Sequence, residues 1–297
     1  MGTTERASKR KGVMFIVVAT LGFSLIPILA QVGLSPKMTA GTLLFYRFFI
    51  AGILFFIYCL VTGRKVMLHS GKQYFFVIIA GCIYSAQCIF FFSSFNYISS
   101  SIGEILYHCY PLFVLILAYI VLKESITYNK VIGVILSIIG VSIVLYAPWS
   151  DAEIKGIVYV ILTAAISAIY MVYTKKFVAD IETTILTMYL CFTCSTVYLT
   201  YTLIQGEFVI PNEGAIVANI FILAICSTVI GFFCFMKSIS LLTVGEVSIL
   251  SLLEPVFTVI IAFLILDVKL TVVQLCGSAV ILASIYVYDK PSKPLKE

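Results

Sequence analysis

Long apolar blocks separated by short polar segments run through the whole chain. Ten blocks recur, at residues 13–33, 41–62, 73–95, 102–122, 130–147, 156–177, 184–204, 216–237, 246–266 and 270–288. At a rise of about 1.5 Å per residue, a helix of about 20 residues crosses a hydrocarbon core of about 30 Å. The strands of a membrane barrel would give shorter, alternating segments. The pattern therefore predicts an all-α polytopic membrane protein with ten transmembrane helices.

The second half of the chain repeats the first at an offset of 144 residues. Residues 105–133 align without a gap on residues 249–277, and the identical pairs include Pro111/Pro255, Phe113/Phe257, Thr127/Thr271 and Gly133/Gly277. Each half holds five predicted helices, an odd number, so the second half must cross the membrane upside down. We therefore expect two inverted five-helix repeats, residues 1–150 and 151–297. Inverted repeats are typical of carriers that alternate access around a site at the repeat interface.

Charge is sparse and unevenly placed. The chain is 62% hydrophobic and 11% charged, with a mean hydropathy of +1.13, whereas soluble domains carry about a quarter charged residues. Alternate loops and the two tails hold fifteen Lys and Arg residues, against three in the remaining loops. The positive-inside rule then places both termini in the cytoplasm. We expect the membrane to be a plasma membrane, the inner one of a bacterium. The net charge of +5 is thus a topology signal and predicts no nucleic-acid partner.

The nine cysteines all fall within predicted helices, where Cys behaves as a small apolar residue. Cys191 and Cys194 form a C-x-x-C pair, but a zinc site would need further ligands, and the chain has only His69 and His108. No phosphate-binding G-x-x-x-x-G-K-[ST] motif occurs. We therefore predict no catalytic residue, metal or cofactor. A membrane thiol oxidoreductase built on Cys191 and Cys194 stays open as an alternative of another class.

Three motifs carry a resemblance to a known family. They are Pro111 followed by Lys123-Glu124, the segment Leu253-Glu254-Pro255-Val256-Phe257-Thr258, and Phe45-Tyr46-Arg47-Phe48. With the inverted repeat, the chain resembles the drug/metabolite transporter superfamily, and within it the EamA-type ten-helix transporters. The resemblance implies a secondary carrier of amino acids, other metabolites, purines or nucleotide-like solutes, often in the export direction. The chain departs from the family pattern at one place. The pair Lys123-Glu124 of the first half corresponds to Asp267-Val268 in the second, where Asp267 is expected to replace the lost acid one residue earlier.

Glu254 is the most informative polar residue within a predicted helix. It lies about 12 Å from the helix start, near mid-membrane, and directly precedes Pro255, which weakens the helical hydrogen bonding. A carboxylate in hydrocarbon needs a partner, a water-filled cavity or a proton. Glu254 is therefore expected either to receive a cationic group or a proton, or to hydrogen-bond a neighbouring helix in a packing role.

The helix at residues 102–122 presents Glu104, Tyr107, His108 and Pro111 on one face. His108 is expected either to titrate or bind substrate, or to be a neutral side chain tied to a backbone carbonyl or a tyrosine. Arg47 is expected to pair with Glu104; its other interpretation is capture of a substrate carboxylate or phosphate.

Helical position and depth give the candidate site residues. Those predicted to bind substrate are Tyr84, Gln87, Phe91, Tyr107, His108, Tyr110, Tyr170, Tyr173, Phe232, Ser251 and Glu254. Those predicted to couple protons or form an ion pair are Glu254, His108, Arg47 and Glu104, and the predicted helix hinges are Pro27, Pro111 and Pro255.

The fifth and tenth predicted helices carry stripes of small residues, including Gly133, Gly140, Gly277 and Ser284. Such stripes allow close helix approach, either with each other or with a second protomer in a homodimer. The sequence thus predicts a membrane carrier, and not an enzyme, that exports a small organic metabolite such as an amino acid or nucleoside-like solute. A broad exporter of cationic drugs shares this architecture and remains an alternative. The acids Glu254 and Glu104 with one arginine favour zwitterionic or cationic solutes over polyanions.

Overall fold

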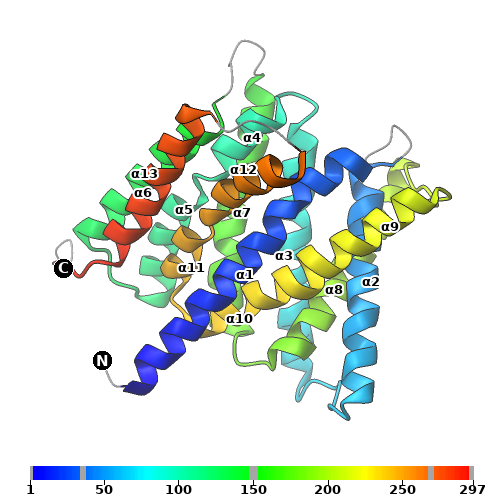
Figure 1. Cartoon of the computed structure of the whole chain (residues 1–297). Helices are drawn as coiled ribbons and strands as arrows, with labels where there is room; N and C mark the ends of the chain where they lie inside the picture. The colour runs from blue at the N-terminus through cyan, green and yellow to red at the C-terminus, as the bar shows by residue number, and fades with distance from the viewer. Residues whose placement is uncertain (1–2, 34–37, 147–152, 267–270, 294–297) are drawn as a thin grey trace.

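The computed structural model describes residues 3–33, 38–146, 153–266 and 271–293, which form helices joined by short loops (Figure 1). Seven predicted membrane segments are single helices: α1 (Thr3–Gly33), α2 (Ala40–Val61), α3 (Gly71–Ser94), α6 (Tyr128–Val144), α7 (Ile154–Phe177), α8 (Thr183–Gln205) and α13 (Val272–Asp289).

The other three segments are composite. The fourth consists of α4 (Ser100–Tyr107), α5 (Tyr110–Leu117) and the π-helical turn η1 (Ala118–Leu122). The eighth consists of α9 (Gly214–Leu223), the π-helical η2 (Ala224–Phe232) and α10 (Phe233–Leu241), and the ninth of α11 (Val244–Leu250) and α12 (Leu253–Leu266). Among the described residues, nine segments are long and apolar enough to cross a membrane, and α6, with 17 residues, is shorter. The predicted all-helical membrane architecture is confirmed.

Hydroxyl side chains mark where several helices begin. The Thr127 hydroxyl accepts a hydrogen bond from the Lys130 amide (3.4 Å), and the Thr271 hydroxyl accepts one from the Gln274 amide (3.2 Å). Both contacts satisfy backbone donors that the first turn of a helix leaves free. The identity of Thr127 and Thr271 across the repeat therefore reflects one capping role, at the start of α6 and of α13.

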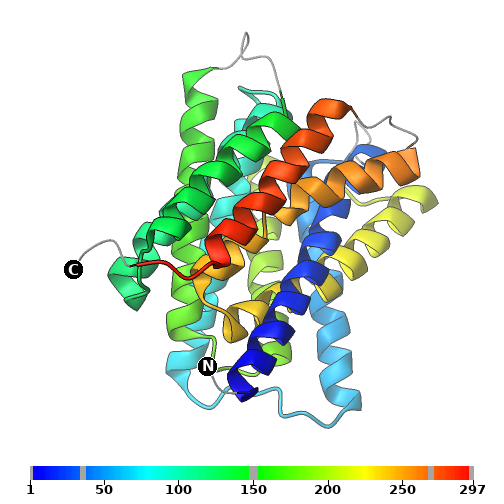
Figure 2. The ribbon, with the colours of Figure 1, turned by 60° about the vertical axis from the view of Figure 1, so that its left-hand side comes forward.

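Contacts between helices follow the inverted repeat. The second and seventh segments, α2 and α8, pack on each other, as do the fifth and tenth, α6 and α13. In addition, α1 packs on η2, α10 and α12, while its counterpart α7 packs on α3 and α5, the corresponding parts of the first half. Each of these contacts therefore either joins two equivalent segments, as between α6 and α13, or has an equivalent contact in the other half. The views from two sides show α6 and α13 side by side at one edge (Figures 1 and 2).

Small residues allow the backbones of α6 and α13 to touch. A Cβ atom added at Gly277 would lie 2.9 Å from the Gly140 carbonyl oxygen, and one at Gly140 would lie 3.1 Å from the Gly277 carbonyl oxygen. A Cβ at Gly133 would similarly meet the Ser284 carbonyl oxygen at 3.0 Å. The two predicted stripes therefore face each other within one chain. This contact uses the surface on which the homodimer hypothesis rested and leaves that hypothesis without support.

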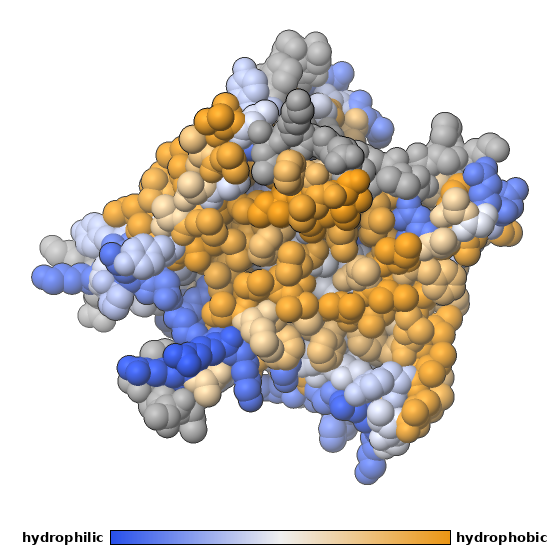
Figure 3. Space-filling model, viewed as in Figure 1, coloured by the Kyte–Doolittle hydropathy of each residue, from blue (hydrophilic) through white to orange (hydrophobic). Residues whose placement is uncertain are grey.

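A belt of apolar side chains surrounds the molecule. In Figure 3 it covers α1, α9, α10, α12 and α13, and hydrophilic residues gather toward the two ends of the helices. Large exposed apolar residues such as Leu60 (58%), Leu264 (69%) and Val272 (75%) would not be stable in water over so wide an area. The belt matches a lipid environment, so the protein is an integral membrane protein.

We expect Gly277→Val to destabilise the protein. Its branched side chain would push apart α6 and α13, and overpacking of this kind costs about 1–3 kcal/mol. Thermal unfolding in detergent micelles should show a clear fall in Tm. The matched change Gly214→Val, at a position with no atom within 4 Å of an added Cβ, should leave Tm nearly unchanged. Equal shifts in both variants would contradict the close contact.

Candidate functional site

Two membrane segments are interrupted at equivalent positions. α4 ends at Tyr107 and α5 begins at Tyr110, while α11 ends at Leu250 and α12 begins at Leu253 (Figure 1). Pro111 and Pro255 follow these breaks and lie in the first turn of α5 and of α12, where a missing N–H costs nothing. Two of the three predicted hinge residues thus lie at breaks. The third, Pro27, lies within α1, which continues past it.

The two breaks face each other across the repeat interface. The Tyr110 hydroxyl donates a buried hydrogen bond of 3.1 Å to the carbonyl oxygen of Ser248 in α11. At the offset of 144, Tyr110 corresponds to Glu254, and Ser248 corresponds to Glu104. Glu254 in turn lies within electrostatic range of Glu104. The inverted symmetry therefore gives two related pairs of residues: Tyr110 and Ser248, which are joined by a hydrogen bond, and Glu254 and Glu104, which are within electrostatic range.

Arg47, on α2, is buried beside this crossing. Its side chain is only 4% exposed, and its Nε donates to the Thr228 hydroxyl of η2 at 2.6 Å. The guanidinium carbon lies 5.0 Å from the centroid of the Phe48 ring. The expected ion pair with Glu104 is not present among the described contacts, and the buried Nη2 has no hydrogen-bond partner there. A buried guanidinium is thus left with unused donors.

Glu104, Tyr107 and Glu254 lie close to the helix breaks and are only partly buried. The Glu104 side chain is 33% exposed. Glu254 lies within electrostatic range of both Glu104 and Arg47. Two carboxyl groups and one cation therefore influence one another near the breaks.

Hydrogen bonds hold the α4 side chains in place. His108 Nδ1 lies 2.7 Å from the Glu104 carbonyl oxygen, so that nitrogen carries the hydrogen and donates it. The amide of Gln87, on α3, donates to the Tyr107 hydroxyl at 3.2 Å. Ser251 donates to the Val247 carbonyl oxygen of its own helix at 2.8 Å. The structure thus favours the packing interpretation of His108, tied to a backbone carbonyl, over a free titrating group.

Aromatic rings form two groups around these polar residues. Tyr84 has its ring centroid 5.0 Å from both Tyr170 and Phe232, deep between α3, α7 and η2. Tyr107 lies 5.1 Å from Phe91 and 5.3 Å from Tyr110. These six predicted site residues are therefore brought together with Gln87, Ser251 and Glu254.

Tyr173 lies outside this arrangement. Its ring packs against Phe177 at 4.8 Å and Phe76 at 6.4 Å, about one helical turn from Tyr170 toward the end of α7. Sequence reasoning placed it with Tyr170 because both are tyrosines three residues apart on one helix. One helical turn along α7 therefore separates Tyr173 from the aromatic group that contains Tyr170.

Three residues that lie beside the site were not predicted from the sequence. Phe48 is fully buried and its ring lies 5.9 Å from Phe232, and Tyr198 lies 5.7 Å from Phe48. Thr228 supplies the hydroxyl that receives the Arg47 hydrogen bond. Phe48 was signalled by its place directly after Arg47 in the motif on α2. Nothing in the chain pattern marks Tyr198 or Thr228, because their role depends on which helices meet.

Cys191 and Cys194 are free, fully buried thiols within α8. Cys194 Sγ lies 3.6 Å from the Gly81 carbonyl oxygen of α3. Reactive cysteines are usually accessible and lie beside positive charge. This placement gives no support to a thiol oxidoreductase. No group of three or more His, Cys, Asp or Glu side chains suited to a metal ion occurs among the residues described.

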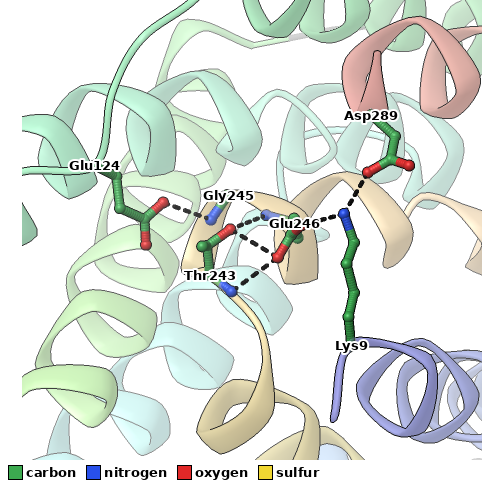
Figure 4. A network of polar contacts seen from close by, with 6 residues as sticks. All are labelled: Lys9, Glu124, Thr243, Gly245, Glu246 and Asp289. Atoms are coloured by element: carbon green, nitrogen blue, oxygen red, sulfur yellow. Dashed lines mark hydrogen bonds and ion pairs between the residues drawn. The ribbon is translucent and has the colours of Figure 1, made fainter. Parts of the chain in front are cut away.

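A polar network closes the face at which α1 begins and α13 ends, here called the terminal face (Figure 4). The Lys9 ammonium contacts Glu246 at 2.8 Å and Asp289 at 2.6 Å. The Glu124 carboxylate accepts hydrogen bonds from the amides of Val244 (2.9 Å) and Gly245 (3.4 Å). The network joins the loop after η1 to α11, and α11 to α1 and α13. Asp267, the predicted substitute for this acid in the second half, lies outside the described residues.

These features place the protein in the class of helical membrane transporters. Inverted repeats with helices broken inside the membrane are typical of that class. The sequence pattern of the EamA-like transporter family matches residues 10–146 and 154–288, one match in each half. The chain belongs to this family.

Relatives and a solved structure agree with the assignment. An uncharacterised transporter of Archaeoglobus fulgidus is 28% identical over 241 residues, which cover 81% of this chain and 85% of the relative. One of Haemophilus influenzae is 25% identical over 260 residues, covering 84% and 82%. A crystal structure with 17% sequence identity matches with a TM-score of 0.81 over 94% of this chain and 96% of the other. At that identity the structural match supports the fold alone.

We expect Tyr110→Phe to weaken the contact between the two helix breaks. The substitution removes one hydrogen bond and leaves the Ser248 carbonyl without that donor, for a loss of about 1 kcal/mol in the free energy of unfolding. Thermal unfolding of the purified protein tests this. Tyr119→Phe, on the lipid-facing side of η1, is the control, because Tyr119 is 49% exposed. A Tyr110→Phe variant as stable as the control would show that the hydrogen bond does not hold the breaks together.

Proposed function

We propose that this protein is a secondary carrier that exports a small zwitterionic metabolite, such as an amino acid, by alternating access around a site between the two helix breaks. The observation that carries this proposal is the buried Nη2 of Arg47, which has no hydrogen-bond partner among the described residues, on a guanidinium within electrostatic range of Glu254. The terminal face lies in the cytoplasm, as the distribution of Lys and Arg favours, and the membrane is a bacterial inner membrane. Export is the direction that the resemblance to EamA-type carriers favours.

A zwitterion satisfies the charges of this site better than a simple anion or cation. A bidentate carboxylate fits the free donors of Arg47, and an ammonium group fits the carboxylate of Glu254. Each ion pair offsets the cost of a charge in the membrane interior, and the occupied site has little net charge. The rings of Tyr84, Tyr170 and Phe232 then suit an apolar or planar side chain of the solute.

Glu254 also gives the carrier a means of coupling. Its carboxylate has no hydrogen bond or ion pair of its own among the described residues, so it is available to a substrate ammonium or to a proton. Binding of one excludes the other at the same oxygen atoms. Competition of this kind couples solute movement in one direction to proton movement in the other.

The terminal-face network acts as the gate in this proposal. Lys9 holds α1, α11 and α13 together at this face, and the Glu124 carboxylate accepts a hydrogen bond from the start of α11. Partly exposed ion pairs are worth about 0.2–1 kcal/mol each, which is weak enough to break in every cycle. The gate therefore closes the cytoplasmic side without locking it.

We expect Glu254→Gln and Arg47→Gln each to lower transport at least about tenfold, because each removes the charge that the proposal assigns to one end of the solute. A thermal-shift screen of amino acids, nucleosides and lipophilic cations first identifies a ligand, since binding stabilises the folded state. Transport of that ligand is then measured in proteoliposomes. Glu207→Gln and Arg10→Gln, at exposed positions, serve as matched controls.

Two outcomes would count against the proposal. Wild-type transport rates in both site variants would remove the site from the solute pathway. Stabilisation by many lipophilic cations, with no response to zwitterions, would favour a broad exporter of cationic drugs, which the two central acids also suit.

We expect Lys9→Met to make the terminal face open more easily, by about two- to tenfold in the opening equilibrium, because two ion pairs are lost. Hydrogen–deuterium exchange of the α11 amides reports this opening. Lys11→Met, at an exposed neighbouring position, is the control. Identical α11 exchange in both variants would show that the network does not act as the gate.

A further inference from the structure

A hollow of about 790 Å³ lies near the terminal face between α2, the loop before α8, and the helix formed by η2 and α10. Its walls include Leu54, Tyr58, Ile225 and Val229, and its end nearer the loops includes Arg64, Asp180, Glu182 and Lys237. It shares no residue with the candidate site. A role for this hollow is therefore independent of the function proposed above.

The hollow opens toward the lipid. Leu54 is 36% exposed, Tyr58 48% and Ile225 42%, and all three belong to the apolar belt around the molecule. Ile225 and Lys237 both line the hollow and are twelve residues apart, which is at most about 18 Å along a helix axis at about 1.5 Å per residue. This length is comparable to half of a hydrocarbon core of about 30 Å, the depth that one acyl chain of a lipid occupies. The shape thus suits an amphiphile with its polar group near the loops.

Charges of both signs occupy the polar end, and two of them are unpaired. Arg64 and Glu182 form an ion pair, and the Glu182 carboxylate raises the pKa of the Arg64 guanidinium. Neither Lys237 nor Asp180 makes a hydrogen bond or ion pair in the described part of the chain. Lys175 is within electrostatic range of Asp180, but its ammonium donates to the carbonyl oxygens of Ile239, Ser240 and Leu242.

We propose that this hollow binds a phospholipid whose headgroup carries a phosphate and a primary ammonium, as in phosphatidylethanolamine. Lys237 receives the phosphate, and Asp180 accepts hydrogen bonds from the ammonium. An anionic lipid such as phosphatidylglycerol has no ammonium group, so it would leave Asp180 without a partner beside an added negative charge. A quaternary ammonium has no N–H to donate, so phosphatidylcholine lacks the second contact. The apolar walls favour a membrane lipid over a water-soluble zwitterion.

Native mass spectrometry of the detergent-purified protein, titrated with palmitoyl-oleoyl lipids, tests the assignment. Phosphatidylethanolamine should bind about fivefold or more tightly than phosphatidylcholine or phosphatidylglycerol. Asp180→Asn should reduce phosphatidylethanolamine binding to the level of phosphatidylcholine, because it removes the ammonium contact alone. Lys237→Gln should weaken both zwitterionic lipids about equally. Lys176→Gln, on the same face but outside the hollow, should change neither.

Three results would overturn the proposal. Equal affinity of the wild-type protein for all three lipids would show only non-selective lipid contact. Tightest binding of phosphatidylglycerol would show a site for anionic lipids. Displacement of phosphatidylethanolamine by an equal concentration of glycerophosphoethanolamine, which has no acyl chains, would show a site for a soluble zwitterion. Unchanged Tm values for Asp180→Asn and Lys237→Gln exclude loss of folding as the cause of any change.

Discussion

Backbone groups that lose their helical partners inside a membrane must find other partners within the protein, because hydrocarbon offers none. Pro111 and Pro255 create this requirement at equivalent depths in the two halves. The structure meets it by placing the two breaks against each other, and the Tyr110 hydroxyl reaches the Ser248 carbonyl oxygen across the interface. A helix break therefore fixes the place where the two halves meet, and that place becomes the centre of the carrier.

The repeat is most informative where it is imperfect. Tyr110 and Glu254 occupy equivalent positions, yet one carries a neutral hydroxyl and the other a carboxyl group. The tyrosine forms a hydrogen bond within the protein, whereas Glu254 remains available. One half thus provides a hydrogen bond between the two breaks, and the other provides a carboxyl group without a partner among the described residues. With Arg47 on α2, this asymmetry gives the proposed site charges of both signs.

Two kinds of contact hold the helices together. α6 and α13 touch through Gly133, Gly140 and Gly277, and close packing of this kind does not weaken with salt. The terminal face depends instead on Lys9 and a few partly exposed acids, whose contacts water replaces at low cost. In the proposed carrier, the first kind of contact would keep one pair of helices together while the second would allow others to separate.

The sequence by itself determined the membrane class, the helix positions, the inverted repeat and the helix breaks beside Pro111 and Pro255, and it raised Glu254 as a candidate. These follow from local properties: apolar length, an odd number of segments per repeat, and the chemistry of proline and of a charge in hydrocarbon. Only the tertiary structure decided the partners. Arg47 bonds to Thr228, which is 181 residues away, and not to Glu104, and Tyr173 lies one turn outside the aromatic group. Helical periodicity gives the face of a residue, but the neighbour of that face depends on how the whole bundle packs.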